Sequence, residues 1–161
     1  MKHLKKLAAL LLVGVLALSL LTACGGGGGS TSADAQAEAA VMAAINENRP
    51  VGSANVKLQN SSELRKIANQ DLDAAISGKW GQLSSSFTFK DHTDLKNGKI
   101  GYTFIAKCDY KNTDLAKLIK TDTNIKNHYM DKWSEVGVVV RTDKDNGQTY
   151  IAISVAINTK T

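Results

Sequence analysis

Residues 133–157 read WSEVGVVVRTDKDNGQTYIAISVAI, and this stretch decides the fold. Two β-rich runs, Trp133–Arg141 and Gln148–Ile157, flank the sequence Asp-Asn-Gly at 145–147. Asn-Gly between two runs rich in β-branched and aromatic residues is typical of a hairpin turn. The stretch therefore predicts an antiparallel hairpin.

The second strand of this hairpin has two unlike faces. Large apolar side chains occupy one alternation, whereas the other holds only the small residues Ala152, Ser154 and Ala156. Successive side chains of a strand point to opposite faces of the sheet, so both alternations need an apolar neighbour. We expect another element to pack closely on the small face and the sheet to be covered on both sides.

Two helices are predicted upstream of the hairpin. The segment Asp34–Asn48 is alanine-rich, its apolar residues share one helical face, and Pro50 follows where the helix must end. Asn60 and Glu63 have the spacing of a capping box before a second, amphipathic helix, and Gly78 stands where a C′ glycine belongs.

A strand and a short helix are predicted between the second helix and the hairpin. Residues 100–108 alternate as a strand does, and Thr113 is placed to cap a helix over Asp114–Lys120. Phe87-Thr88-Phe89 also favours a short strand. In one alternative, residues 87–90 pair with residues 100–108 as a hairpin around Asn97-Gly98.

The order helix, helix, strand, helix, hairpin predicts an α/β (α+β) domain. The expected architecture is an α-β-α sandwich with a central antiparallel sheet of three or four strands, because this buries both kinds of apolar face. The alternative is an unrelated small α+β fold, in which a four-stranded meander carries both helices on one face.

The first 24 residues predict an export signal. Lys2, Lys5 and Lys6 precede an apolar run that is shorter than the roughly 18–20 residues of a membrane span. The run ends in Leu21-Thr22-Ala23-Cys24, which resembles the bacterial lipobox, whose cysteine is acylated before cleavage. The resemblance implies a lipoprotein signal peptide over 1–23 and a palmitate-type lipid anchor at Cys24. An ordinary secreted protein or a single-span anchor are the alternatives.

The remaining chain is predicted to be one tethered domain. Residues 24–33 comprise the lipidated cysteine and a Gly/Ser linker, which spans roughly 15–18 Å, and residues 34–161 form the domain. Only Cys108 then remains as a thiol, so the domain must be stabilised by its core and not by an intramolecular disulfide. We expect it at the extracytoplasmic face of the cell membrane.

The charge of the chain does not indicate nucleic-acid binding. The full chain has 20 Lys and Arg against 15 Asp and Glu, a net charge of +5. Removing residues 1–23 takes away three lysines and no acid, so the net charge falls to +2. Aspartates also interleave with the lysines between Lys90 and Lys132, which is typical of a solvated face. The expected partners are the membrane, through the lipid on Cys24, and an unidentified envelope ligand or protein, with the domain monomeric.

Three strings resemble the CAP superfamily, the fold of cysteine-rich secretory and plant pathogenesis-related proteins. They are Ile45-Asn46-Glu47-Asn48-Arg49 at a helix end, Leu64-Arg65-Lys66-Ile67-Ala68 in the next helix, and Tyr129 through Val138 before the last hairpin. The likeness covers residues 36–157. It implies an α-β-α sandwich with a cleft, which in the family is lined by two histidines and two glutamates that hold a divalent cation.

The sequence departs from the family pattern at these cleft positions. Gly101-Tyr102-Thr103 has no acid where the family has a Gly-Glu-Asn string, and Asn124 stands where its second histidine lies. His92 takes the place of the first histidine. The resemblance therefore implies a degenerate member, with no metal and no cofactor.

The candidate catalytic residues are His92, His128 and Glu135. His92 lies in a polar stretch whose flanking aspartates, Asp91 and Asp94, are placed to orient its imidazole. A solvated loop histidine, a packing histidine at 128 and a surface or capping glutamate at 135 are the plainer interpretations.

The sequence favours a binding function over catalysis. Cys108 is expected to be a buried structural thiol, and no hydrolase elbow or phosphate-binding glycine loop is present in the sequence. We expect a non-catalytic binding or interaction module at the cell envelope. The alternative is an envelope hydrolase with a cleft centred on His92.

Overall fold

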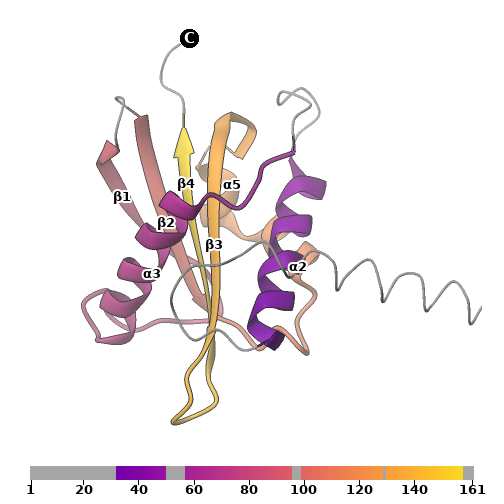
Figure 1. Ribbon diagram of the computed structural model, residues 1–161, viewed down its shortest axis with the longest axis vertical. Coiled ribbons are helices and arrows are strands. Elements are labelled where there is room, and N and C mark those ends of the chain that lie inside the picture. Colours follow the sequence, from indigo (N-terminus) through magenta and orange to yellow (C-terminus); the bar gives the residue numbers. More distant parts are fainter. Residues whose placement is uncertain (1–31, 50–56, 96–98, 129, 158–161) are drawn as a thin grey trace, which may run out of the picture.

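The computed structural model of the chain describes residues 32–49, 57–95, 99–128 and 130–157. Helices and strands alternate in pairs along these residues (Figure 1). The elements in chain order are α2 (Ser32–Asn48), α3 (Ser62–Ile76), β1 (Thr88–Leu95), β2 (Lys99–Lys107), α4 (Leu115–Thr121), α5 (Thr123–Asn127), the 3₁₀ turn η3 (Met130–Lys132), β3 (Trp133–Thr142) and β4 (Thr149–Ile157).

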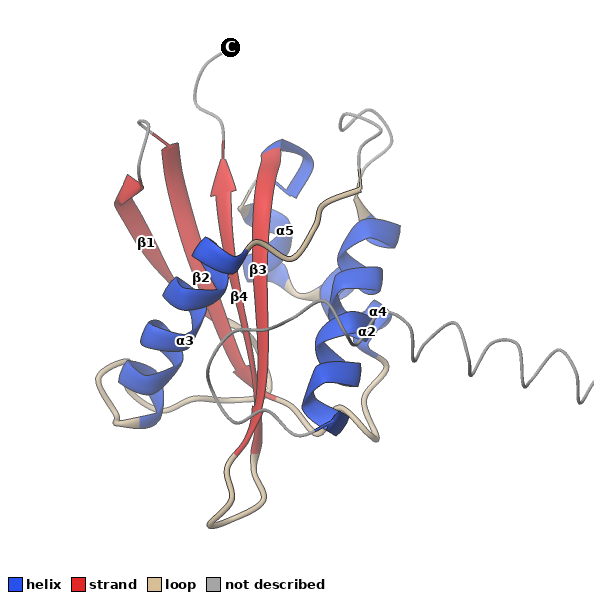
Figure 2. Cartoon of the chain, viewed as in Figure 1, coloured by secondary structure: helices blue, strands red, loops and turns tan. Residues whose placement is uncertain are grey.

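The four strands form one antiparallel sheet in the order β1-β2-β4-β3. The helix α3 crosses one face of the sheet, and α2, α4 and α5 cover the other (Figures 1 and 2). The expected α-β-α sandwich with a central antiparallel sheet is thus confirmed. Helices lie on both faces and the strand order is not sequential, so the alternative meander with both helices on one face is wrong.

Each face of the sheet has its own apolar core. The core on the side of α2 is the larger, and the core under α3 is smaller, with alanine or valine at half of its positions. The buried residues under α3 are Ala68, Leu72, Ala75, Leu83, Ile105, Val139, Tyr150 and Ala152. Short side chains let the axis of α3 come near the strands, which fits the small face predicted for β4.

Gly137 of β3 is a point of close approach between α3 and the sheet. A Cβ atom on Gly137 would lie 2.3 Å from the backbone nitrogen of Arg65, inside the first turns of α3. Such a contact is sterically forbidden, so only glycine permits this approach.

The alternative in which residues 87–90 pair with residues 100–108 is confirmed, because β1 and β2 are antiparallel neighbours. The structure extends or corrects three other predictions. The strand β1 continues through Asp91 and His92 to Leu95, where a polar stretch was expected. A further short helix, α5, lies between α4 and β3. The helix α2 begins at Ser32, so two residues assigned to the linker are helical.

Two predicted helix caps are also wrong by one residue. Ser61, not Asn60, caps α3 and accepts a hydrogen bond from the backbone of Leu64. Asp114, not Thr113, caps α4 through Lys117 N. Asn60 is instead used to cover β3, as described below. Gly78 follows α3 with a φ of +85°, as predicted for a C′ glycine.

Several sequence predictions lie outside the described residues. These are the signal peptide, Cys24 and most of the linker, the helix end at Pro50, and the turn at Asn97-Gly98. Within the part of the chain that is described, no helix is both long enough and apolar enough to span a membrane.

Candidate functional site

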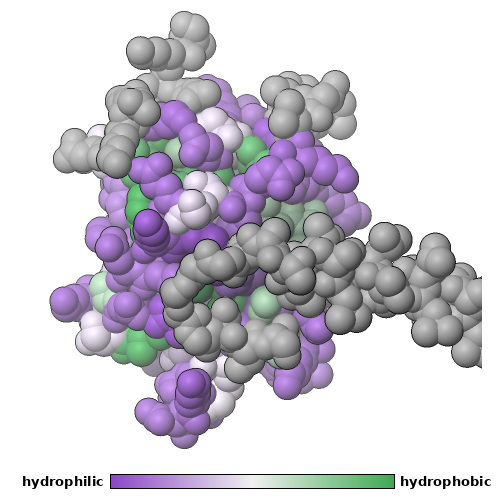
Figure 3. Space-filling model, in the orientation of Figure 1, coloured by the Kyte–Doolittle hydropathy of each residue, from purple (hydrophilic) through white to green (hydrophobic). Residues whose placement is uncertain are grey.

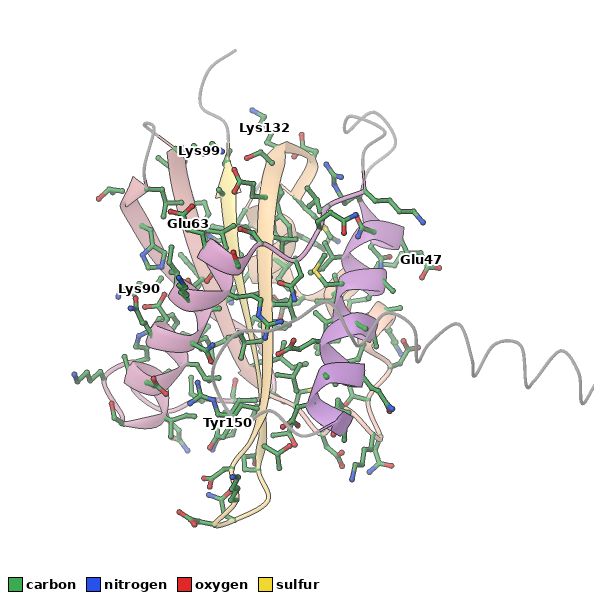
Figure 4. The ribbon with its side chains drawn as sticks, viewed as in Figure 1. Glu47, Glu63, Lys90, Lys99, Lys132 and Tyr150 are labelled. Carbon is green, nitrogen blue, oxygen red and sulfur yellow. The ribbon has the colours of Figure 1, made fainter. Side chains whose placement is uncertain are left out.

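A group of polar side chains lies between α3 and the outer strand β1. We call it the Asp71 cluster; its members are Asp71 of α3, Lys90 and His92 of β1, Thr103 of β2 and Ser154 of β4. The carboxylate of Asp71 lies at its centre. Oδ2 of Asp71 is 2.8 Å from His92 Nε2, and Oδ1 is 3.2 Å from Lys90 Nζ. Figure 4 shows Lys90 beside α3 on the β1 side.

The strand register explains why these residues meet. Lys90 pairs with Thr103 across β1 and β2, and Thr103 pairs with Ser154 across β2 and β4. The three side chains therefore point to the same face of the sheet, the one that α3 covers. His92, two residues after Lys90, shares that face, and Asp71 faces it from the buried side of α3.

Two hydroxyl groups extend the cluster inward from His92. Thr103 Oγ1 is 2.9 Å from His92 Nε2 and 2.7 Å from Ser154 Oγ. Thr103 and Ser154 are buried, and the side chain of His92 is 19% exposed, so the cluster meets solvent at the histidine and at Lys90.

The pKa of Asp71 is lowered from its usual value. Burial alone raises it, but hydrogen bonds from His92 and Thr103, together with the positive charge of its neighbours, outweigh burial. Asp71 is therefore an ionised carboxylate at neutral pH, and an ionised carboxylate only accepts hydrogen bonds.

This charge state fixes the proton on His92. Because Asp71 accepts, Nε2 of His92 carries a hydrogen, and in the neutral ring the basic lone pair is then on Nδ1. Thr103 lies against Nε2, so the histidine has no lone pair aimed at either hydroxyl. The arrangement fastens α3 to the sheet and does not activate Thr103 or Ser154 as a nucleophile does in an acid–histidine–hydroxyl triad.

The structure does not bring His92, His128 and Glu135 together. His128 follows α5 on the opposite face of the sheet, where its ring centroid is 4.1 Å from that of Phe89 and 4.6 Å from that of Tyr102. Its Nδ1 contacts the carbonyl oxygen of Asn124. His128 is thus both a helix-end and a packing residue.

Glu135 lies on β3, at the far end of the sheet from the β3–β4 turn. Its carboxylate forms an ion pair with Lys99 of β2, which is labelled at that end of the sheet in Figure 4, and its side chain is 42% exposed. The ion pair crosses over β4 and links two strands that are not neighbours. Glu135 is a surface residue with a structural partner.

The prediction that His92 sits in a polar loop is wrong. It lies on β1, and its carboxylate partner is Asp71, twenty-one positions earlier and on a helix, instead of an adjacent aspartate. Asp71 was missed by sequence reasoning. It could have been found from its place on the apolar stripe of α3, between Ala68 and Ala75, because a carboxylate there is buried and needs a partner.

The two positions matched to the histidines of the CAP cleft also lie apart. His92 is on the α3 side of the sheet, whereas Asn124 is on α5 on the other side and donates to the carbonyl oxygen of Phe87. Within the residues that the structure describes, no three His, Cys, Asp or Glu side chains are grouped as metal ligands.

Cys108 is buried directly after β2 and is a free thiol, as the alternation predicted. Burial raises the pKa of this thiol, although a hydrogen bond with Thr113 works in the opposite direction. A protonated, buried thiol packs as a small apolar group.

Comparisons with known protein families, with curated proteins and with solved structures find no match to this chain. The residue-level geometry above is therefore the basis for a functional assignment.

Proposed function

We propose that this chain is a lipoprotein anchored through Cys24, whose single domain is a non-catalytic binding module at the extracytoplasmic face of the cell membrane. The anchor is supported by the basic start, the short apolar run and Leu21-Thr22-Ala23-Cys24, followed at once by glycines. Two or more acyl chains on one cysteine hold a protein stably on a bilayer without a spanning helix.

The binding role is carried by one observation, the use made of the polar side chains at the Asp71 cluster. Asp71 accepts from both His92 and Lys90, and the hydroxyl of Thr103 contacts Ser154. Each group thereby joins one element of the fold to another. Side chains that bond to one another in this way hold the elements of the fold, and hence the surface of the domain, in place. An enzyme needs groups aimed at a substrate to transfer protons or to act as a nucleophile.

We further propose that the domain is a degenerate CAP-like domain. The three strings that carry the resemblance contact one another in the fold. Arg49 Nη2 is 3.3 Å from the carbonyl oxygen of Trp133, and Gly137 packs against the backbone of Leu64 and Arg65. These contacts make the three strings neighbours in one fold, as the resemblance requires.

Acyl labelling of the full chain tests the anchor. We expect Cys24→Ala to lose acyl label and to leave the membrane fraction, whereas Cys108→Ala, which removes the buried thiol, keeps both. A Cys24→Ala protein that stays fully membrane-bound and unlabelled would show that the uncleaved apolar run is the anchor. Label on the Cys24→Ala protein would contradict lipidation at this residue.

A hydrolase centred on His92 is the second candidate. It would use His92 with the carboxylate of Asp71 and the hydroxyl of Thr103, although both of these groups contact the same nitrogen, Nε2 of His92. Hydrolysis of a panel of activated esters and amides by the purified chain, and by His92→Gln, distinguishes the two functions. Turnover that is abolished by His92→Gln would replace the binding proposal with the hydrolase.

A further inference from the structure

A polar cavity of about 350 Å³ lies between the β3–β4 turn and the loop that follows β2. This volume is at the lower end of the range for small-molecule sites. Its walls include Asp109, Tyr110 and Lys111 on the loop and Thr142, Asn146 and Gln148 on the hairpin.

The cavity lies next to the point where the domain begins. The hydroxyl of Thr142, on the cavity wall, donates to Asp34 Oδ1 at 2.7 Å, and Asp34 is in the first turn of α2. Figure 1 shows the start of α2 and the β3–β4 turn at the same end of the molecule. The opposite end of the sheet, where β3 begins, is one strand length away, about 30 Å.

The sequence places the predicted anchor close to this end. Seven residues separate Cys24 from Ser32, the first residue of α2. A Gly/Ser-rich chain of this length has an r.m.s. span of roughly 13–16 Å, which is about half the length of the sheet. With Cys24 in the membrane, the end of the domain that carries the cavity is the end nearest to the lipid headgroups.

The charges at this end are mixed. Lys111 and Asp109 stand two residues apart on the cavity wall, and in the neighbouring turn Lys144 lies between Asp143 and Asp145. The β3–β4 turn is hydrophilic in the surface view (Figure 3). With three aspartates against two lysines, these residues do not attract an anionic surface, so the pattern fits a ligand that itself carries both charges.

Phosphoethanolamine has the two charges that the wall can pair. Its phosphate is an acceptor for the ammonium group of Lys111, and its ammonium is a donor to Asp109. The carboxylate of Asp109 already accepts from Lys111 N at 3.3 Å and from Asn112 Nδ2 at 2.7 Å, and a carboxylate has about four acceptor positions. Tyr110 packs its ring against the core beside them, as tyrosines do at polar–apolar boundaries.

We propose that the end of the domain at which α2 begins faces the membrane and that the cavity there binds the zwitterionic headgroup of a phospholipid. This inference rests on the proposed anchor at Cys24. The domain would thereby hold a fixed orientation on the membrane, with the Lys99–Glu135 end of the sheet turned outward to a partner.

Binding is tested by titrating the full acylated chain, in maltoside micelles, with glycerophosphoethanolamine. We expect saturable amide shifts at Lys111 and Gly147, and at least tenfold weaker binding in Lys111→Gln and in Asp109→Asn, which keeps the local turn acceptor. Lys144→Gln is the matched control, because Lys144 is an exposed lysine in the neighbouring β3–β4 turn and is not among the residues that line the cavity. The absence of saturable shifts, or unchanged binding in Lys111→Gln, would overturn the proposal.

Parallel titrations with glycerophosphoglycerol and with inorganic phosphate identify the ligand chemistry. Weaker binding of both supports a zwitterionic headgroup. Binding of inorganic phosphate as tight as that of glycerophosphoethanolamine would make the cavity a phosphate site and overturn the headgroup assignment.

Orientation is tested in bicelles that contain a gadolinium-chelating lipid. We expect the resonances of Asn146 to broaden more than those of Glu135, and the reverse order would overturn the proposal. The mass of the purified chain distinguishes a failure of the anchor from a failure of the headgroup site. A chain without acyl groups refutes the anchor at Cys24, and the titration then still tests whether the cavity binds the headgroup. An acylated chain that shows no amide shifts refutes only the headgroup site.

Discussion

The two edges of the sheet are completed in different ways. Along β3, groups from α2 and from the residues just before α3 bond to the outward-facing backbone at every second residue. Ser61 N donates to Val136 O, and the side chain of Asn60 bonds both N and O of Val138. Further along the strand, the carboxylates of Glu38 and Asp34 accept from Val140 N and Thr142 N. These contacts, most of them from side chains, take the place of a fifth strand. Unpaired backbone at a sheet edge is a template for aggregation, and here it is covered.

The edge at β1 depends on its own side chains. Lys90 and Asp91 place charge along the strand, and the register shifts between His92 and Leu95. Both features discourage pairing with another chain. Beyond β2, the strand β1 is tied to the rest of the molecule by the Asp71 cluster on one face and by the contact of Phe89 with His128 on the other. The comparison teaches that the two edges are held by different chemistry. Polar groups of α2 and of the residues just before α3 bond to the backbone of β3, whereas a buried carboxylate of α3 binds side chains of β1.

Glu38→Ala is expected to have the largest effect on this comparison, because it disrupts the β3 edge. Glu38 is buried and forms a bidentate pair with Arg65, at 2.6 and 3.1 Å, besides accepting from Val140 N. The substitution takes the bidentate carboxylate from Arg65 and the acceptor from Val140 N, and losing one partner of a buried ion pair costs about 3–5 kcal/mol. Urea unfolding measures the loss.

Glu47→Ala is the matched control for this change. Glu47 lies on the same helix with an exposed side chain, which points away from the sheet in Figure 4. Surface substitutions stay within about 0.5 kcal/mol. Equal losses in Glu38→Ala and Glu47→Ala would show that the edge contacts of Glu38 contribute nothing and that only helix propensity had changed.

Sequence patterns predicted the covered parts of the fold better than its edges. The alternation in β4 and the small side chains of its second face indicated a sheet buried on both sides, and α3 lies where that face required. The charged residues of β1 conceal its strand character, because an edge strand needs no apolar alternation. The cap of α3 was displaced for a related reason: the side chain of Asn60, a good capping residue, bonds instead to the backbone of β3.

The candidate site was predictable only in part. His92 was recognised as the histidine with nearby carboxylates, and its true partner lies on α3. A single sequence shows which residues share a helix face or a strand face. It does not show which helix face meets which strand, and Asp71 and His92 meet only through the packing of α3 across the sheet.

Asp71→Asn disrupts the other edge and is expected to have a smaller effect. The asparagine keeps the shape but lacks the charge that accepts from His92 and Lys90, and hydrogen bonds to charged groups contribute about 1.5–3 kcal/mol, part of which the amide recovers. We expect a loss of about 1–2 kcal/mol in urea unfolding and faster amide exchange in β1 than in β3. Asp73→Asn is the control, because Asp73 is exposed and its ion pair with Arg141 contributes at most about 1 kcal/mol. Uniform exchange across both edges would contradict a local role for Asp71.

The pH dependence of unfolding gives the finest test of the same edge. The folded state lowers the pKa of Asp71 below its usual value of 3.8, so the unfolded state takes up the proton first as the pH falls. The stability due to Asp71 is therefore fully present above pH 3.8 and is lost as the pH falls through the folded pKa. Glu38 behaves oppositely: burial raises its pKa from 4.5 in spite of Arg65, so its charged form is favoured less in the folded state than in the unfolded one. The gap in unfolding free energy between the wild type and Asp71→Asn should consequently narrow below pH 3.8, measured by urea titrations at successive pH values. A gap that stays constant through this range would mean that the Asp71 carboxylate is not the charge that holds β1 to α3.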